Sequence, residues 1–204
     1  MLREDGIVMD DGTTTRISEN HYHMTTTTAQ AANVLSHLEY YLQLVWPELD
    51  VTVVSTTEQW AGAAIAGPKS RYLLQKLFPN TYVSNEGLPF MGYTEGDLFG
   101  VKARIFRISF SGELAYEVNV ESDNGNFMWE KIIEIGKDFD LQPYGTEALS
   151  TLRIEMGHVA GSELDGRTIP YDTGLDGLVS KKKDFIGKRS LLKKAYNEKD
   201  RQRL

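Results

Sequence analysis

The sequence predicts an α+β protein in which helical and strand-like segments alternate along 204 residues. Apolar residues recur at helical spacing over residues 28–46, and two strand-like runs separated by a Ser-Gly pair occupy residues 101–120. Hydrophobic residues make up 41% and charged residues 25% of the chain, which is the usage of ordinary globular proteins. A mixed fold with short strands is therefore expected.

The first half of the chain is expected to follow the order β-α-β-β-α. Thr28 is available to cap the first helix, and Pro47 ends it. Pro68 is in the first turn of a second helix. The expected elements are short strands joined by turns at Asp11-Gly12 and Glu19-Asn20, a helix over 28–46, strands over 51–57 and 59–67, and a helix over 67–79.

The second half begins with a Gly- and Pro-containing stretch over residues 85–100, where no strand is expected. We place a domain boundary at its start, which gives domains 1–84 and 85–204. The expected elements are a β pair over 101–110 and 113–120 with its turn at Ser111-Gly112, helices over 124–137 and 144–157, a long loop over 158–178, and an amphipathic helix within the basic segment 181–204.

Composition excludes several classes of function. The net charge of -7 disfavours nucleic acid as a partner. The absence of cysteine excludes disulfides, thiolate metal sites and cysteine nucleophiles, and agrees with a cytoplasmic protein. No apolar run reaches the roughly 20 residues of a membrane-spanning helix, so no membrane association is expected. The glycine spacings of phosphate-binding loops are also missing.

Carboxylates remain as candidates for chemistry. Asp10 and Asp11 follow an apolar strand, although Asp-Gly is itself a strong turn signal and favours the turn for at least one of them. Alternation places Glu117 opposite Tyr116 and Val118, so that an ordinary solvated strand residue is the simpler interpretation. The four histidines are scattered, and we expect no metal site.

Four segments stand out, in this order: "GIVMDDG", "SFSGELAYEVNV", "ALSTLRIEMG" and "DGRTIPYDTGLDGLVSKKKDFIGKR". Together they resemble the aminomethyltransferase family, the T-protein of glycine cleavage and its relatives. The segments "MLREDGIVMDDGTTTRISENHYHMTTTTAQA" and "YGTEALSTLR" resemble more closely the folate-binding part of sarcosine oxidase alpha subunits. The resemblance covers essentially the whole chain, and it implies a fragment of split β-α-β (ferredoxin-like) subdomains that lacks the family's C-terminal β-barrel.

The resemblance also implies roles for individual residues. The catalytic acid beside the reactive nitrogens of tetrahydrofolate corresponds to Asp11, and the pterin-binding glutamate corresponds to Glu117. Phe110 occupies a position that is tyrosine in many T-proteins, so ring packing is kept and a hydroxyl is lost. The T-protein arginine that contacts folate aligns with Leu149, and Arg153, the nearest cation on the helix, lies one turn away.

The function implied is capture of the one-carbon unit from oxidative demethylation of sarcosine on tetrahydrofolate, giving 5,10-methylenetetrahydrofolate. The expected partners are folate and the other sarcosine oxidase subunits, while the FAD, FMN and NAD of the intact oxidase would bind elsewhere. The fragment alone is expected to be inactive. Two alternatives stay open: a T-protein-like aminomethyltransferase or dimethylglycine dehydrogenase relative, and a non-catalytic assembly scaffold.

Overall fold

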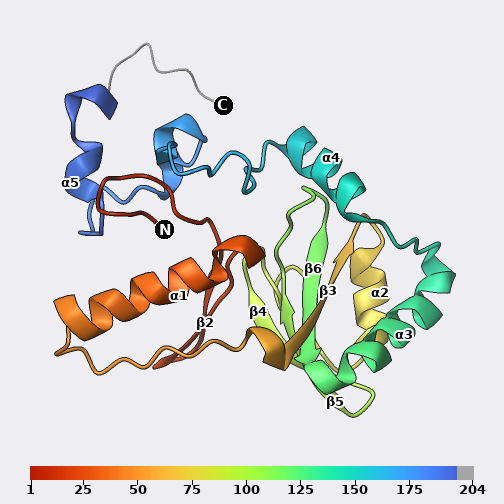
Figure 1. Ribbon diagram of the computed structural model, residues 1–204. Coiled ribbons are helices and arrows are strands. Elements are labelled where there is room, and N and C mark those ends of the chain that lie inside the picture. Colours follow the sequence, from red (N-terminus) through yellow and green to blue (C-terminus); the bar gives the residue numbers. More distant parts are fainter. Residues whose placement is uncertain (197–204) are drawn as a thin grey trace. The chain divides into compact units, whose positions relative to one another are not determined.

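The computed structural model, in which residues 1–196 are described, divides the chain into two compact units (Figure 1). The first unit combines Met1–Ser55 with Val159–Leu204, and the second is Thr56–His158. The division between residues 84 and 85 expected from the sequence does not coincide with this boundary. Strand β3 (Trp60–Ala66), which precedes residue 84, pairs along its whole length with β6 (Ala115–Glu121), which follows it.

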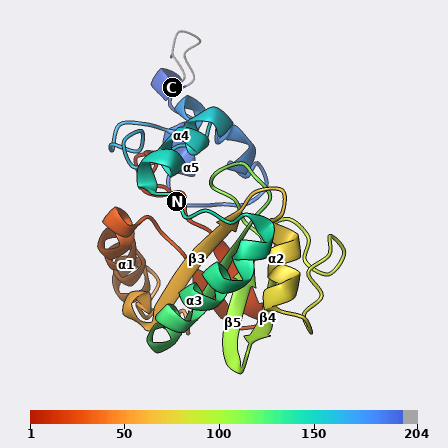
Figure 2. The same cartoon turned by 90° about the vertical axis from the view of Figure 1, so that its right-hand side faces the viewer.

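The second unit is a four-stranded antiparallel sheet with helices on one face. Its strand order is β3-β6-β5-β4, where β5 is Val101–Phe106 and β4 is Tyr93–Leu98. Helices α2 (Ser70–Leu77) and α3 (Gly125–Gly136) lie against the same side of the sheet (Figure 2). The expected α+β class is confirmed, as are the strand over 59–67, the β pair over 101–120 and both helices.

The core of this unit lies between the sheet and the two helices. Tyr116, Val118 and Val120 of β6 are fully buried there, together with Leu74 and other apolar residues of α2 and α3. Because successive strand residues point to opposite faces, Glu117 must project from the other face of the sheet. Alternation in the sequence predicted this division of β6 correctly.

Two strand predictions differ from the structure. Residues 51–56 form no strand, because no neighbouring segment pairs with them and Val51 and Val54 remain exposed. Conversely, β4 lies inside the stretch where no strand was expected. Its glycine is required by packing, since a Cβ atom on Gly96 would lie 2.7 Å from the Phe78 ring. Gly and Asp weaken the strand pattern, but pairing with β5 supplies the missing stability.

Helix α4 (Thr146–Met156) follows, as predicted, and ends at Gly157, whose positive φ of 78° closes the helix in the left-handed conformation. None of its residues is buried. Within residues 1–196, no helix has the length and apolar character that a membrane span requires.

The first unit begins with a segment that approaches the β1–β2 hairpin. Strands β1 (Thr14–Ser18) and β2 (His21–Met24) pair antiparallel around the predicted Glu19-Asn20 turn. The predicted turn at Asp11-Gly12 is wrong, because this stretch is extended. A Cβ atom on Gly12 would lie 1.8 Å from the Thr25 carbonyl oxygen, so glycine is needed here for close approach rather than for chain reversal.

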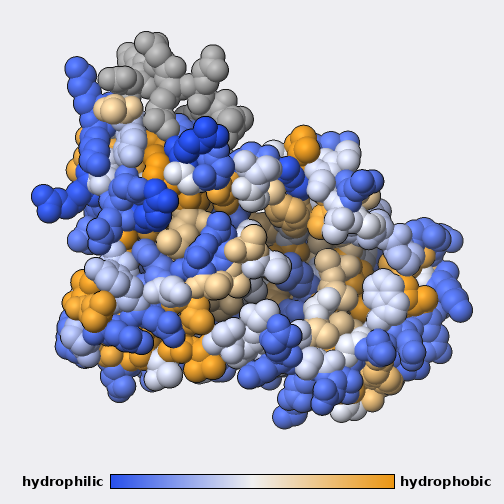
Figure 3. All heavy atoms as spheres, viewed as in Figure 1, coloured by the Kyte–Doolittle hydropathy of each residue, from blue (hydrophilic) through white to orange (hydrophobic). Residues whose placement is uncertain are grey.

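The predicted helix over 28–46 forms in three parts. A 3-10 turn (Thr28–Gln30) leads into α1 (Ala31–Tyr40), and a π-helical turn (Tyr41–Val45) ends the element before Pro47. Thr28 lies inside the 3-10 turn and does not cap the helix. Apolar side chains gather on the surface over the far end of α1 (Figure 3), where Leu44 is 71% exposed.

The long loop over 158–178 is confirmed, apart from two single 3-10 turns. The predicted C-terminal helix forms only as α5 (Lys188–Leu191) and a 3-10 turn (Lys194–Tyr196), and its remainder lies outside the described residues. Leu191 packs with Ile7 and Ile169 in a small second core. No barrel occurs among residues 1–196.

Tyr41 offers a test of the first unit's packing. This side chain is 7% exposed, and its hydroxyl donates a 2.8 Å hydrogen bond to Glu4 Oε1. We expect Tyr41→Phe to lower the free energy of unfolding by about 1 kcal/mol, because a buried hydrogen bond to a carboxylate is lost. Urea unfolding measures the change, with the exposed Tyr22→Phe as the matched control. Equal stability of the two variants would contradict the prediction.

Candidate functional site

Glu117 occupies the middle of the face of the second unit's sheet that lies opposite helices α2 and α3. On β6 it lies between Ala64 of β3 and Phe106 of β5, its partners in the two antiparallel ladders. The backbone of a central strand is held by hydrogen bonds on both sides, so the position from which the Glu117 side chain projects is fixed. The side chain is only partly exposed, although it faces away from the core.

The Glu117 carboxylate is unusual because nothing in the described part of the chain pairs with it. No hydrogen bond or ion pair to this group is found among residues 1–196, and desolvation by burial raises its pKa above the ordinary glutamate value of 4.5. A half-buried carboxylate without a partner costs free energy. Such groups are found preferentially at functional sites, where a ligand supplies the missing partner.

Aromatic side chains flank Glu117 on the same face. Phe106 is 4% exposed, and its ring lies 5.1 Å from that of Tyr93. The guanidinium of Arg104 lies 4.0 Å from the centre of the Trp60 ring. Burial, assisted by a hydrogen bond to a neighbouring glutamate, raises the pKa of Tyr93 to about 12, so this hydroxyl stays neutral. The face therefore places the Glu117 carboxylate near aromatic rings, an arrangement that suits a planar ligand.

Phe110 and Arg153 meet at His158. The Phe110 ring stacks on the imidazole with 5.8 Å between ring centres, and the Phe110 carbonyl oxygen lies 3.0 Å from His158 Nδ1. Arg153 Nη1 donates a 3.2 Å hydrogen bond to the His158 carbonyl oxygen. In the sequence, His158 is only one of four scattered histidines. In the structure it joins the end of α4 to the loop between β5 and β6.

The two aspartates of the first unit have different environments. Asp10 is 2% exposed and accepts hydrogen bonds from Thr27, at 2.7 Å from Oγ1 and at 3.2 Å from the backbone nitrogen. Asp11 is exposed. Asp10 therefore ties the N-terminal segment to residue 27.

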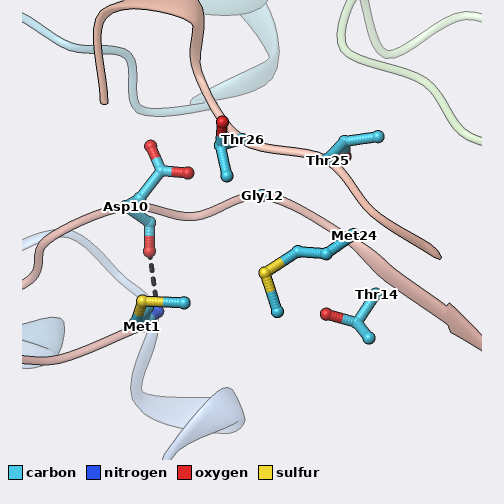
Figure 4. Close-up of a pocket in the computed structure, with 7 residues that line it drawn as sticks. All are labelled: Met1, Asp10, Gly12, Thr14, Met24, Thr25 and Thr26. Carbon is cyan, nitrogen blue, oxygen red and sulfur yellow. Dashed lines mark hydrogen bonds between the residues drawn. The ribbon is translucent and has the colours of Figure 1, made fainter. Parts of the chain in front are cut away.

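A cavity of about 260 Å³ lies beside these aspartates in the first unit. Asp10 and Gly12 form one side of it, and Thr25 and Thr26 face them (Figure 4). Asp11 is not among the lining residues, which are completed by Met1, Thr14 and Met24. The wall is thus part hydroxyl and part thioether. Among the described residues, no three histidines, aspartates or glutamates lie close enough together to hold a metal ion.

The chain belongs to the family described as the GCVT N-terminal domain, which matches residues 1–183. The resemblance to aminomethyltransferases seen in the sequence is thereby confirmed.

Individual relatives narrow this assignment. The chain is 49% identical over its full length to the sarcosine oxidase subunit alpha of Rhizobium meliloti (strain 1021) and 47% identical to that of Corynebacterium sp. (strain P-1). It covers 21% of the length of each, so it spans about a fifth of these relatives. Over 95% of the chain it is also 31% identical to the aminomethyltransferase of Chloroherpeton thalassium (strain ATCC 35110 / GB-78), of which it covers 52%.

The fold has a solved counterpart. The crystal structure of glycine cleavage system aminomethyltransferase T from Bartonella henselae superimposes with a TM-score of 0.79, at 23% sequence identity. The match covers 94% of this chain and 50% of that one. The expected fold, split α+β subdomains of the aminomethyltransferase type, is therefore confirmed.

Proposed function

We propose that this chain supplies the folate-binding part of a sarcosine-oxidising enzyme. In this role it binds tetrahydrofolate and captures the one-carbon unit released by oxidative demethylation of sarcosine, which yields 5,10-methylenetetrahydrofolate. The high identity to sarcosine oxidase alpha subunits supports the sarcosine reaction over other folate chemistry. We place the assembly in the cytoplasm, with other oxidase subunits as partners of the chain.

Glu117 is the observation that supports folate binding most directly. A pterin presents a ring N–H and an exocyclic amine side by side, and a carboxylate accepts both in a forked arrangement of charge-assisted hydrogen bonds. The half-buried, unpaired carboxylate on the central strand β6 meets this requirement. The neighbouring Tyr93 ring, which packs on the buried Phe106 ring, supplies apolar contact for a planar bicycle.

Phe110 and Arg153 are proposed as further folate contacts. The Phe110 ring is 40% exposed and stacks on His158, so one aromatic surface remains available to a ligand. Arg153 is the nearest cation on α4, since leucine occupies position 149. The Arg153 bond to the His158 carbonyl oxygen holds the guanidinium near this stack.

Asp11 is proposed as the catalytic acid. Closing a one-carbon bridge between N5 and N10 of tetrahydrofolate releases water, and that step requires proton transfer and stabilisation of a developing cation. An accessible carboxylate can serve both needs. Asp11 is exposed and Asp10 is buried, and a substrate reaches an exposed carboxylate more readily.

The flavins and NAD of an intact oxidase are proposed to bind outside this chain, because its sequence contains no dinucleotide-binding glycine pattern. A second candidate function is a T-protein-like aminomethyltransferase, which the 31% identity to an aminomethyltransferase favours. Both candidates share the pterin site and differ in the donor of the one-carbon unit.

Titration of the 204-residue chain with 5-formyltetrahydrofolate by calorimetry tests the proposed function. We expect saturable binding of one ligand per chain. Circular dichroism of the same sample shows whether the protein is folded. The absence of binding by a folded chain would contradict the proposal that these residues alone form the pterin site. In the intact enzyme, formation of methylenetetrahydrofolate from sarcosine rather than from an aminomethylated carrier protein separates the two candidates.

A further inference from the structure

Buried polar atoms without partners are concentrated in one short segment of the second unit. Four such side-chain atoms occur among the described residues, and three of them are Arg107 Nε, Ser109 Oγ and Ser111 Oγ. Ser111 is only 7% exposed. Buried polar groups in native proteins almost always have a hydrogen-bond partner, so three orphans within five residues call for a bound group.

The first residue of this segment, Arg107, lies on the helix-covered side of the sheet. Arg107 continues the β4–β5 ladder, because its N–H donates to the Gly92 carbonyl oxygen and its own carbonyl oxygen accepts from the Met91 N–H, each at 2.9 Å. Phe106, one residue earlier, shares the face of Glu117. The Arg107 side chain therefore projects to the face opposite Glu117.

Positive charge at this place is not neutralised within the described part of the chain. Arg107 Nη1 donates to the Leu88 carbonyl oxygen at 3.0 Å, and no carboxylate pairs with the guanidinium. Arg71 contacts the same stretch of chain, since its Nη2 donates a 2.6 Å hydrogen bond to Asn85 Oδ1, three residues before Leu88. Arg71 likewise has no ion-pair partner among the described residues. The carboxylate of Glu86, in the same stretch, is exposed and accepts a hydrogen bond from the Ser84 hydroxyl.

We propose that Arg107, Ser109 and Ser111 form a binding site for a small carboxylate. The three residues stand at alternate positions, and Phe110 between the two serines is exposed, which places the other side chains on the inner side of the segment. Arg107 Nε and the two rotatable hydroxyls are all donors, and a carboxylate is an acceptor that also balances the guanidinium charge. One cation with neutral hydroxyls suits a monovalent anion better than a divalent one.

Thermal unfolding of the full chain in acetate or formate tests this site, with chloride as the reference salt at constant ionic strength. We expect a saturable rise in Tm with carboxylate concentration, because a ligand that binds only the folded state stabilises it. The double variant S109A/S111A should bind at least about tenfold more weakly. Its Tm in chloride should not fall, since removing an unsatisfied hydroxyl costs no hydrogen bond. Ser162→Ala, which removes an exposed hydroxyl, should respond like the unmodified chain.

Three results would contradict the proposed carboxylate site or its assignment. No carboxylate-dependent rise in Tm, or an equal rise in S109A/S111A, would overturn the site and leave ordered water as the partner of these atoms. A larger response to sulfate than to acetate would overturn the carboxylate assignment. Titration of S109A/S111A with 5-formyltetrahydrofolate distinguishes two sources of the bound carboxylate, the folate itself and a free acid. Weakened binding would identify the carboxylate as part of the folate, and unchanged binding with a lost acetate response would identify a free acid.

Discussion

Replacing Glu117 with glutamine should weaken binding of 5-formyltetrahydrofolate by about a hundredfold or more. The substitution keeps the size of the side chain but exchanges one acceptor oxygen for an NH₂ donor, which would face a donor of the pterin. One of the two charge-assisted hydrogen bonds is lost and the other becomes a weaker neutral bond, and each charge-assisted bond contributes roughly 1.5–3 kcal/mol. Calorimetric titration of the Glu117→Gln chain measures the loss.

Glu121→Gln is the matched control for this experiment. Glu121 lies at the end of the same strand and is exposed, so its substitution changes the net charge equally without touching the proposed acceptor. We expect wild-type affinity for this variant. Equal affinity of Glu117→Gln and the wild type would show that the pterin binds elsewhere.

The same substitution should raise the stability of the free protein at neutral pH. Burial raises the folded-state pKa of Glu117, so its contribution to stability is present below the ordinary glutamate range and is lost as pH rises through the raised pKa. Glutamine carries no charge and escapes this loss. We expect Glu117→Gln to unfold at higher denaturant near pH 7, by on the order of 1 kcal/mol, and to match the wild type near pH 4. A less stable variant at pH 7 would indicate that Glu117 has a structural role instead.

Hydrophobic periodicity was sufficient to predict the helices and central strands of the second unit. Helices α2 and α3 and strand β6 each have an apolar face that is visible in their own sequence. These faces meet in the core. Residues 51–57 show the limit of this approach. A run of valine and threonine is strand-like by composition, yet a strand exists only where a neighbour pairs with it, and none does. Pairing is a property of the whole chain.

Glycine caused two further fold errors. Gly96 weakened the pattern of β4, and Gly12 suggested a turn where the chain is extended. In both positions the absent side chain makes room for a neighbour, the Phe78 ring in one case and the Thr25 carbonyl in the other. A glycine that leaves room for a residue distant in sequence looks, in the local sequence, the same as a glycine that forms a turn.

The candidate site was predictable only in part. Alternation places Glu117 on the face opposite the core. It does not show that Phe106 of β5 and Ala64 of β3 are its neighbours, because the sequence of one strand does not determine its register with another. The desolvation that distinguishes Glu117 from a solvated strand residue follows from that register and from surrounding side chains. His158 is the clearest omission, since only tertiary contact joins it to Phe110.

Asp11→Asn should lower folate-dependent one-carbon capture by about 10²–10⁴-fold, the range that general acid–base groups contribute. Asparagine keeps the shape of the side chain but cannot accept or release the proton. Because Asp11 is exposed, the free energy of unfolding should change little. The yield of methylenetetrahydrofolate per sarcosine oxidised, measured in the intact multi-subunit enzyme, reports capture separately from oxidation.

Asp10→Asn provides the opposite pattern and completes the test. Its carboxylate accepts from both the hydroxyl and the backbone nitrogen of Thr27 while buried, so the amide would oppose one donor with another. We expect a loss of about 1–3 kcal/mol in stability, with capture retained by the molecules that remain folded. If a folded Asp10→Asn enzyme lost capture while Asp11→Asn kept it, the acid would have to be the buried aspartate, and its bonds to Thr27 would then serve to position a catalytic group.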